Sequence, residues 1–260
     1  MEFLEHFILI KSYLFLLVFA RVIGFLLFLP VIGGRQIPRQ VRLFWAIVFA
    51  AMITSLLGDL PISAFPQLWK MGMKLIAEFL FGLFISVGVL IFFSCLTIAG
   101  EIIGRLGGFS IASMFNSGFN DQKTAFSQFL ILFGIVIFII IGGLNILIAG
   151  FIDSFNNIPP GEASFQSNWT LILVQLLGLS IELTFRLVAP VIATSLLIFL
   201  VIGLLGRTFP QLNVLSISFS FSTLLTFCVL FLGIGTILLC FQQKISIFLQ
   251  IIFDSFSINQ

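Results

Sequence analysis

Charge is scarce in this chain. Lys, Arg, Asp and Glu together make up 8% of its 260 residues, whereas a soluble domain carries roughly 25%. Apolar residues make up 60%, which is more than one soluble core of this length can enclose. The composition therefore excludes an ordinary soluble domain. It also excludes a disordered chain, because disorder requires low hydrophobicity.

Residues that carry chemistry are also rare. The three cysteines, Cys95, Cys228 and Cys240, lie in apolar runs without CxxC spacing, so neither a disulfide scaffold nor a zinc site is predicted. The single histidine, His6, has no Ser or Cys helper nearby, and no phosphate-binding loop, HExxH or GxSxG motif occurs. The basic residues are scattered, so no nucleic-acid-binding face is expected. The sequence predicts no enzyme and no cofactor.

Long apolar runs are what the chain does contain. A membrane-spanning helix needs about 20 apolar residues, and six regions qualify: about 12–30, 41–58, 72–99, 126–152, 170–203 and 212–241. Pro190 in the fifth region predicts a kink or a break into two helices, and the shorter stretch 245–253 is interpreted as an interfacial piece. We expect an all-α, polytopic membrane protein with a single domain over residues 1–260.

Four charged residues interrupt these apolar runs: Arg21, Glu78, Glu182 and Arg186. Charges within membrane helices are costly and usually pair inside protein. Glu182 and Arg186 are spaced i,i+4 with the acid first, which is the favourable order for a helical pair. This spacing favours mutual neutralisation over a proton relay, which usually needs more acids. Whether Arg21 and Glu78 pair in the same way is left open by the sequence.

The stretch around 100–115 is rich in small and apolar residues. Gly100, Gly104 and Gly108 follow one another at four-residue spacing, which would let another backbone approach if the segment is helical. Gly107 and Gly108 could instead end the helix. An apolar loop exposed to water is a liability, so we expect burial of the residues that follow: Phe109, Ser110, Ile111, Ala112, Ser113, Met114 and Phe115.

Short motifs follow one another in a defined order over nearly the whole chain. The first motifs are Ala20-Arg21 running to Pro30, followed by Gly33 and Ile37-Pro38. Later ones are Gly107-Gly108-Phe109, the pattern from Gly142-Gly143 to Gly161, and Ala189-Pro190. The most specific element is Arg207 with Pro210, Gln211, Asn213 and Val214. In this order, the motifs resemble those of the FliR/SctT family of type III secretion export-gate proteins. One departure is Met114-Phe115-Asn116-Ser117-Gly118, where the family often has an Asp-Pro-like turn.

The resemblance implies a gate subunit built from helical hairpins with broken helices. It implies assembly with FliP-like and FliQ-like subunits and association with FlhA-like and FlhB-like components in the bacterial inner membrane at the flagellar basal body. Residues 107–115 would then be the plug of a pore that passes unfolded proteins. Two alternatives stay open from the sequence: an injectisome subunit of the SctT type, and a small-solute transporter, which would require broken helices in matching halves.

Overall fold

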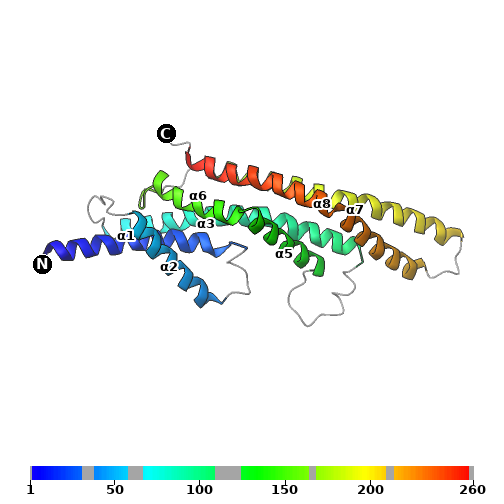
Figure 1. Cartoon of the computed structure of the whole chain (residues 1–260), viewed down its shortest axis with the longest axis horizontal. Helices are drawn as coiled ribbons and strands as arrows, with labels where there is room; N and C mark the ends of the chain where they lie inside the picture. The colour runs from blue at the N-terminus through cyan, green and yellow to red at the C-terminus, as the bar shows by residue number, and fades with distance from the viewer. Residues whose placement is uncertain are drawn as a thin grey trace. The chain divides into compact units, whose positions relative to one another are not determined.

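The computed structural model describes residues 2–30, 38–57, 67–108, 124–163, 168–208 and 214–257. The regular structure within these ranges is helical: α1 (Glu2–Leu27), α2 (Arg39–Leu57), α3 (Leu68–Leu106), α5 (Ala125–Ile140), α6 (Gly143–Asn157), α7 (Asn168–Thr208) and α8 (Val214–Ser257) (Figure 1). Five of these helices are long and apolar enough to cross a membrane, or up to six if the bent pair α5 and α6 counts as one span. The predicted all-α, polytopic fold is confirmed.

The chain divides into two compact units. Unit 1 comprises Met1–Ile91, Leu144–Leu176 and Phe248–Gln260, and unit 2 comprises Phe92–Gly143 and Leu177–Ile247. Stacked aromatic rings fill the core of unit 1, such as Phe25 on Phe151 with ring centroids 4.0 Å apart. In unit 2, the Phe92 and Phe241 centroids lie 5.2 Å apart. Packing of this kind accounts for many of the 35 phenylalanines.

Helices α1 and α3 cross at two glycines in unit 1. A Cβ atom built on Gly24 would lie 2.8 Å from the backbone N of Leu83, and one built on Gly82 would lie 2.9 Å from the backbone N of Phe25. Both distances are shorter than real Cβ contacts, so any side chain here would push the two backbones apart. This close crossing brings Arg21 of α1 into contact with Glu78 of α3.

A glycine also bends the apolar run predicted at 126–152. Gly142 has φ of 78°, and α5 and α6 meet there at 68°. The apolar region predicted at 126–152 therefore contains two helices. Glycine adopts this left-handed conformation without a Cβ clash, and the preceding N–H groups of Ile141 and Gly142 still bond to the last turn of α5, at 3.0 Å each.

The opposite correction applies to the last two helices. α7 runs without interruption through Pro190, so the break predicted there does not occur. α8 runs through 245–253 to Ser257, so that stretch is not a separate interfacial piece. Proline removes a single intrahelical hydrogen bond, and membrane helices tolerate that loss where neighbouring groups compensate.

Candidate functional site

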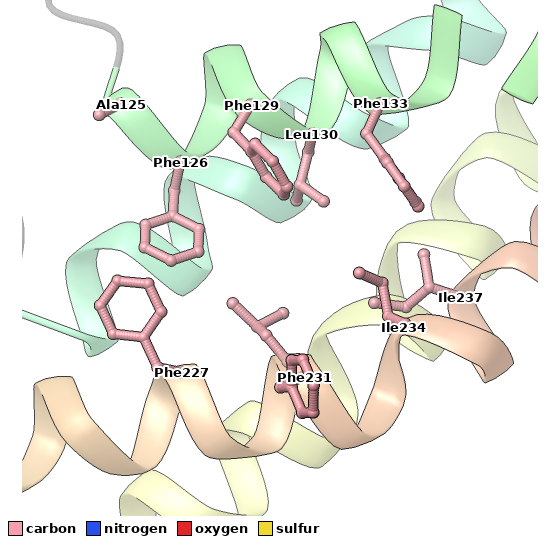
Figure 2. A pocket seen from close by; sticks show the side chains of 10 residues that line it. Ala125, Phe126, Phe129, Leu130, Phe133, Phe227, Phe231, Ile234 and Ile237 are labelled. Carbon is pink, nitrogen blue, oxygen red and sulfur yellow. The ribbon is translucent and has the colours of Figure 1, made fainter. Parts of the chain in front are cut away.

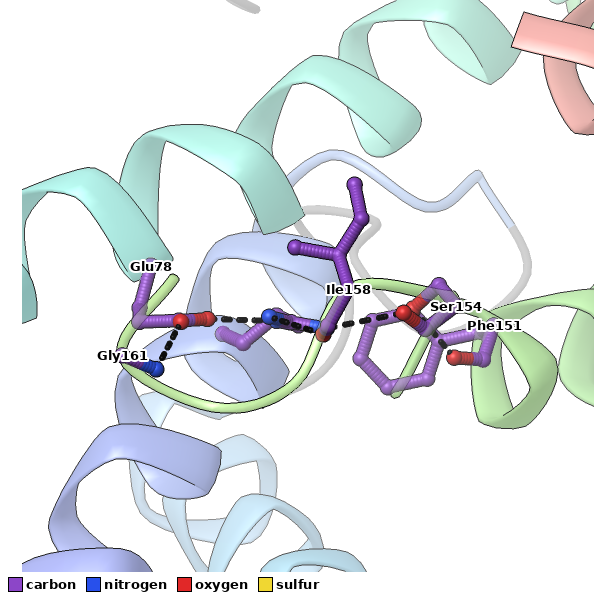
Figure 3. A network of polar contacts seen from close by, with 6 residues as sticks. Glu78, Phe151, Ser154, Ile158 and Gly161 are labelled. Carbon is purple, nitrogen blue, oxygen red and sulfur yellow. Dashed lines mark hydrogen bonds and ion pairs between the residues drawn. The ribbon is translucent and has the colours of Figure 1, made fainter. Parts of the chain in front are cut away.

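Arg21 and Glu78 form a fully buried ion pair in unit 1. Arg21 lies on α1 and Glu78 on α3, and the Arg21 Nε donates to Glu78 Oε2 at 2.5 Å (Figure 3). Both side chains are 0% exposed. The pairing that the sequence left open is therefore present, because the close crossing of the two helices places the two side chains together.

The pair also holds the backbone at the end of α6. Arg21 donates to the carbonyl of Ser154 at 3.3 Å and to the carbonyl of Ile158 at 3.1 Å. Glu78 Oε1 accepts the N–H of Gly161 at 2.7 Å. A cation is favourable here because the C-terminal end of a helix carries partial negative charge.

The segment held by this pair is a tight turn. The N–H of Glu162 donates to the carbonyl of Pro159 at 3.1 Å, and Gly161 has φ of 92°, as a type II turn requires at its third position. The rings of Phe81 and Phe155 lie 4.7 Å and 4.2 Å from the guanidinium carbon of Arg21. With its charge compensated by Glu78, two carbonyls and two aromatic faces, Arg21 fits a role in joining α1, α3 and α6.

A second charged cluster lies in unit 2. Glu182 Oε1 contacts the Arg186 NH2 group at 2.7 Å, and Glu182 Oε2 contacts Lys244 Nζ on α8, also at 2.7 Å. The predicted Glu182–Arg186 pair is confirmed. Sequence reasoning missed Lys244, although it is the one Lys or Arg within α8. A lone cation in an apolar helix is itself a signal that an acidic partner lies near.

The ends of α3 and α5 meet at the predicted glycine strip. A Cβ on Gly100 would lie 2.9 Å from the backbone N of Ser127, and one on Gly104 would lie 2.8 Å from the Thr124 hydroxyl. Thr124 caps α5 by accepting the N–H of Ser127 at 3.3 Å, and its hydroxyl also donates to the Gly100 carbonyl at 3.3 Å. The predicted close approach at these glycines is confirmed.

Gly107 and Gly108, for which the sequence predicts either a glycine strip or a helix end, lie at the end of α3. The helix ends at Leu106 and Gly108 has φ of 82°, so these glycines do end the helix. Two hydroxyls of α8 then bond to the carbonyls at this helix end: Ser222 donates to the Leu106 carbonyl at 2.6 Å, and Thr223 donates to the Gly107 carbonyl at 2.8 Å. The described residues on either side of 109–123 are therefore held by side-chain hydroxyl groups.

The structure places some of the remaining predicted residues. Pro30 follows α1, Pro38 precedes α2 and accepts the N–H of Val41 at 3.1 Å through its carbonyl, and Arg207 is exposed in the last turn of α7. Other predicted residues lie outside the described ranges: Phe109, Ser110, Ile111, Ala112, Ser113, Met114, Phe115, Ile37, Pro210, Gln211 and Asn213.

An apolar groove of about 380 Å³ lies between α5 and α8 in unit 2. Figure 2 shows Phe126, Phe129 and Phe133 on one side, with Phe227 and Phe231 opposite. Phe231 is 80% exposed. Among the described residues, no group of three or more His, Cys, Asp or Glu residues could hold a metal ion. The groove is thus a packing surface without polar groups for chemistry.

These helices and buried charges define the class: an all-α, polytopic membrane protein. The family model for "Bacterial export proteins, family 1" matches residues 12–257. The chain therefore belongs to this family, the FliR/SctT family that the sequence motifs indicate. Membership makes it a membrane component of a type III export apparatus, and the family is not a known enzyme family.

Individual relatives match at similar levels. The chain is 29% identical over 235 residues to the flagellar biosynthetic protein FliR of Caulobacter vibrioides, covering 90% of this chain and 93% of that protein. It is 26% identical over 238 residues to FliR of Aquifex aeolicus, covering 91% of each. It is 27% identical over 234 residues to the surface presentation of antigens protein SpaR of Shigella flexneri, covering 89% and 88%.

Proposed function

We propose that this chain is a structural core subunit of the flagellar type III export gate. As a single functional domain over residues 1–260, it assembles with FliP-like and FliQ-like subunits and works with FlhA-like and FlhB-like components. Together they form the channel through which unfolded flagellar proteins leave the cell, in the bacterial inner membrane at the flagellar basal body. Membrane lipid contacts part of its surface.

The observation that carries this proposal is the length and exposure of α7 and α8. They contain 41 and 44 residues, so at about 1.5 Å per residue each is roughly 60 Å long or more, twice the hydrocarbon thickness of about 30 Å. In the most apolar 18-residue stretch of α8, 11% of residues are buried, against 61% in α3. Lipid tails cannot cover so long an apolar surface, which supports assembly with other subunits.

A second element of the proposal is the plug. We assign residues 107–115 to closing the pore, because the segment that starts there is apolar in sequence and its base is anchored at both ends. Gly107 is held by Thr223, and Thr124 at the far end is held by the Gly100 carbonyl. Such anchoring would hold the two ends of the proposed plug segment at one place in the channel.

The assembly is tested by purifying the tagged full chain from its native host in mild detergent and identifying the proteins that accompany it by mass spectrometry. Stable recovery with FliP-like and FliQ-like subunits is expected. Recovery of the chain alone, together with solute uptake by liposomes that contain it, would overturn the proposal in favour of a transporter.

The plug is tested by replacing 109–115 with a Gly/Ser linker of equal length in the assembled gate. We expect higher ion conductance across the membrane, because a polar, flexible linker cannot seal an apolar constriction. Unchanged conductance in a gate that still assembles would overturn the plug role. The control replaces residues 164–167 in the same way and is expected to leave conductance unchanged.

The match to SpaR favours a second candidate, a subunit of an injectisome of the SctT type. The same purification separates the two, because the accompanying subunits would then belong to an injectisome. Deletion of the gene would abolish effector secretion and leave motility intact.

A further inference from the structure

The charged cluster of unit 2 is not neutral. Glu182 supplies one carboxylate, and Arg186 and Lys244 supply two cations. Lys244 is 15% exposed and contacts Glu182, whereas the Arg186 side chain is 54% exposed. One positive charge in excess therefore lies at the surface of α7, at Arg186.

Small exposed residues lie on the face of α7 that carries Arg186. Residues at helical spacing on the same face of α7 are small and exposed: Gly178, Ala189 and Ala193. A Cβ on Gly178 would meet nothing within 4 Å. Small residues in such a row let a second helix approach closely.

Lipid alone can neither compensate the charge of Arg186 nor cover the apolar residues around it. A guanidinium in hydrocarbon is costly, and charges in membrane helices face protein or water. A lipid headgroup at Arg186 would leave one half of α7 outside the hydrocarbon, yet exposed apolar residues lie on both sides of it. Leu171 and Val174 precede it, at 64% and 63% exposed, and Leu197 follows at 65%. A protein helix can cover both halves and compensate the charge.

We propose that a helix of a neighbouring subunit packs along the face of α7 from Gly178 to Ala193 and places a carboxylate against Arg186. This interface rests on the proposed function, since it requires a subunit assembly. The carboxylate completes a four-charge network of two acids and two bases, so that no net charge remains in the apolar surroundings. Charge complementarity then fixes the register of the two helices.

The test uses the full chain in its native host with a photo-crosslinking amino acid at position 189 or 193. We expect a crosslink to an export-apparatus subunit within one or two helical turns of an Asp or Glu. Arg186→Glu should lower recovery of that subunit at least tenfold. Replacement of the Asp or Glu next to the crosslink by Arg, in the same background, should restore recovery. Arg186→Gln, which keeps the Glu182–Lys244 contact, should lower recovery without unfolding the chain.

The matched control is Arg105→Gln, at an exposed i,i+4 pair with Glu101 on α3 whose N to O distance is 3.9 Å. Its recovery of partners is expected to equal that of the unaltered chain. Crosslinks to lipid alone, normal recovery of the Arg186 variants, or failure of the charge exchange would each overturn the interface. If the unaltered chain recovers no export subunit, the proposed function itself fails, which distinguishes the two results.

Discussion

Arg21 shows how one side chain can organise three helices. Its contacts join α1 to Glu78 on α3 and to the carbonyls of Ser154 and Ile158 around the end of α6. The contacts with Glu78 and Ser154 are buried, and the contact with Ile158 is partly buried. Loss of Arg21 would therefore leave the buried Glu78 carboxylate without its cation, which is the costly change.

The first prediction concerns Arg21→Met. Glu78 would remain as a buried charge without its cation, and breaking a buried pair in this way costs about 3–5 kcal/mol. We expect a lower midpoint of thermal unfolding in mild detergent and loss of the chain from the membrane fraction. Arg105→Met, at an exposed pair, should have a small effect. Unaltered unfolding of Arg21→Met would contradict the structural role assigned to the pair.

At the scale of the elements, the base of the segment 109–123 depends on hydroxyl groups. Ser222 and Thr223 on α8 bond to carbonyls at the end of α3, while Thr124 bonds to Gly100 within α3. These contacts come from residues more than 100 positions apart for α8 and α3, so they order the loop base through tertiary structure.

The double variant Ser222→Ala, Thr223→Val tests this anchoring. Each lost hydrogen bond is worth about 1 kcal/mol, so the loss of two should make backbone amides at 104–108 exchange with deuterium about thirtyfold faster. Hydrogen exchange followed by mass spectrometry measures this. Ser246→Ala is the control, because that hydroxyl bonds within α8, to the Gln243 carbonyl. Equal exchange in both variants would mean that the loop base is held by other contacts.

The elements also show where sequence reasoning succeeds and fails. Apolar runs locate the helices, because hydrocarbon length and helical rise set their size. The same runs conceal the bend at Gly142, since a glycine in an apolar segment gives no sign of its φ. At Pro190 the sequence predicts a kink or a break, and only the break is excluded, because tertiary packing can maintain a helix that has lost one hydrogen bond.

Some ion pairs among the charged residues are predictable from the sequence, and others are not. Glu182 and Arg186 are predictable as a pair, because their spacing on one helix determines their contact. Arg21 with Glu78, and Lys244 with Glu182, are separated by 57 and 62 residues. Such pairs depend on how helices cross, which periodicity within one helix does not specify.

For the whole molecule, uneven burial of the long helices indicates which surfaces other subunits cover. The native cysteines report on this directly, because Cys95 on α3 is buried and Cys228 on α8 is exposed. They therefore act as built-in probes of the two environments.

We expect a small, membrane-permeant maleimide to modify Cys228 in the isolated chain and to leave Cys95 unmodified. In the assembled export apparatus, Cys228 should react at least several-fold more slowly, because other subunits cover the exposed apolar surface of α8. Mass spectrometry of the labelled peptides gives both rates, and labelling after denaturation supplies the reference. Equal reactivity of Cys228 in the two states would argue against coverage of this part of α8.

The buried pair at Arg21 has a consequence for the time course of synthesis. Glu78 is made 57 residues after Arg21, and Ile158 is made 137 residues after it. At about 5–20 residues per second, Arg21 waits roughly 3–11 s for its anion and roughly 7–27 s for its last carbonyl. During that interval the first helix carries an uncompensated cation that the bilayer disfavours. Synthesis as far as Ile158, rather than entry of the first helix, therefore commits this segment to its final position.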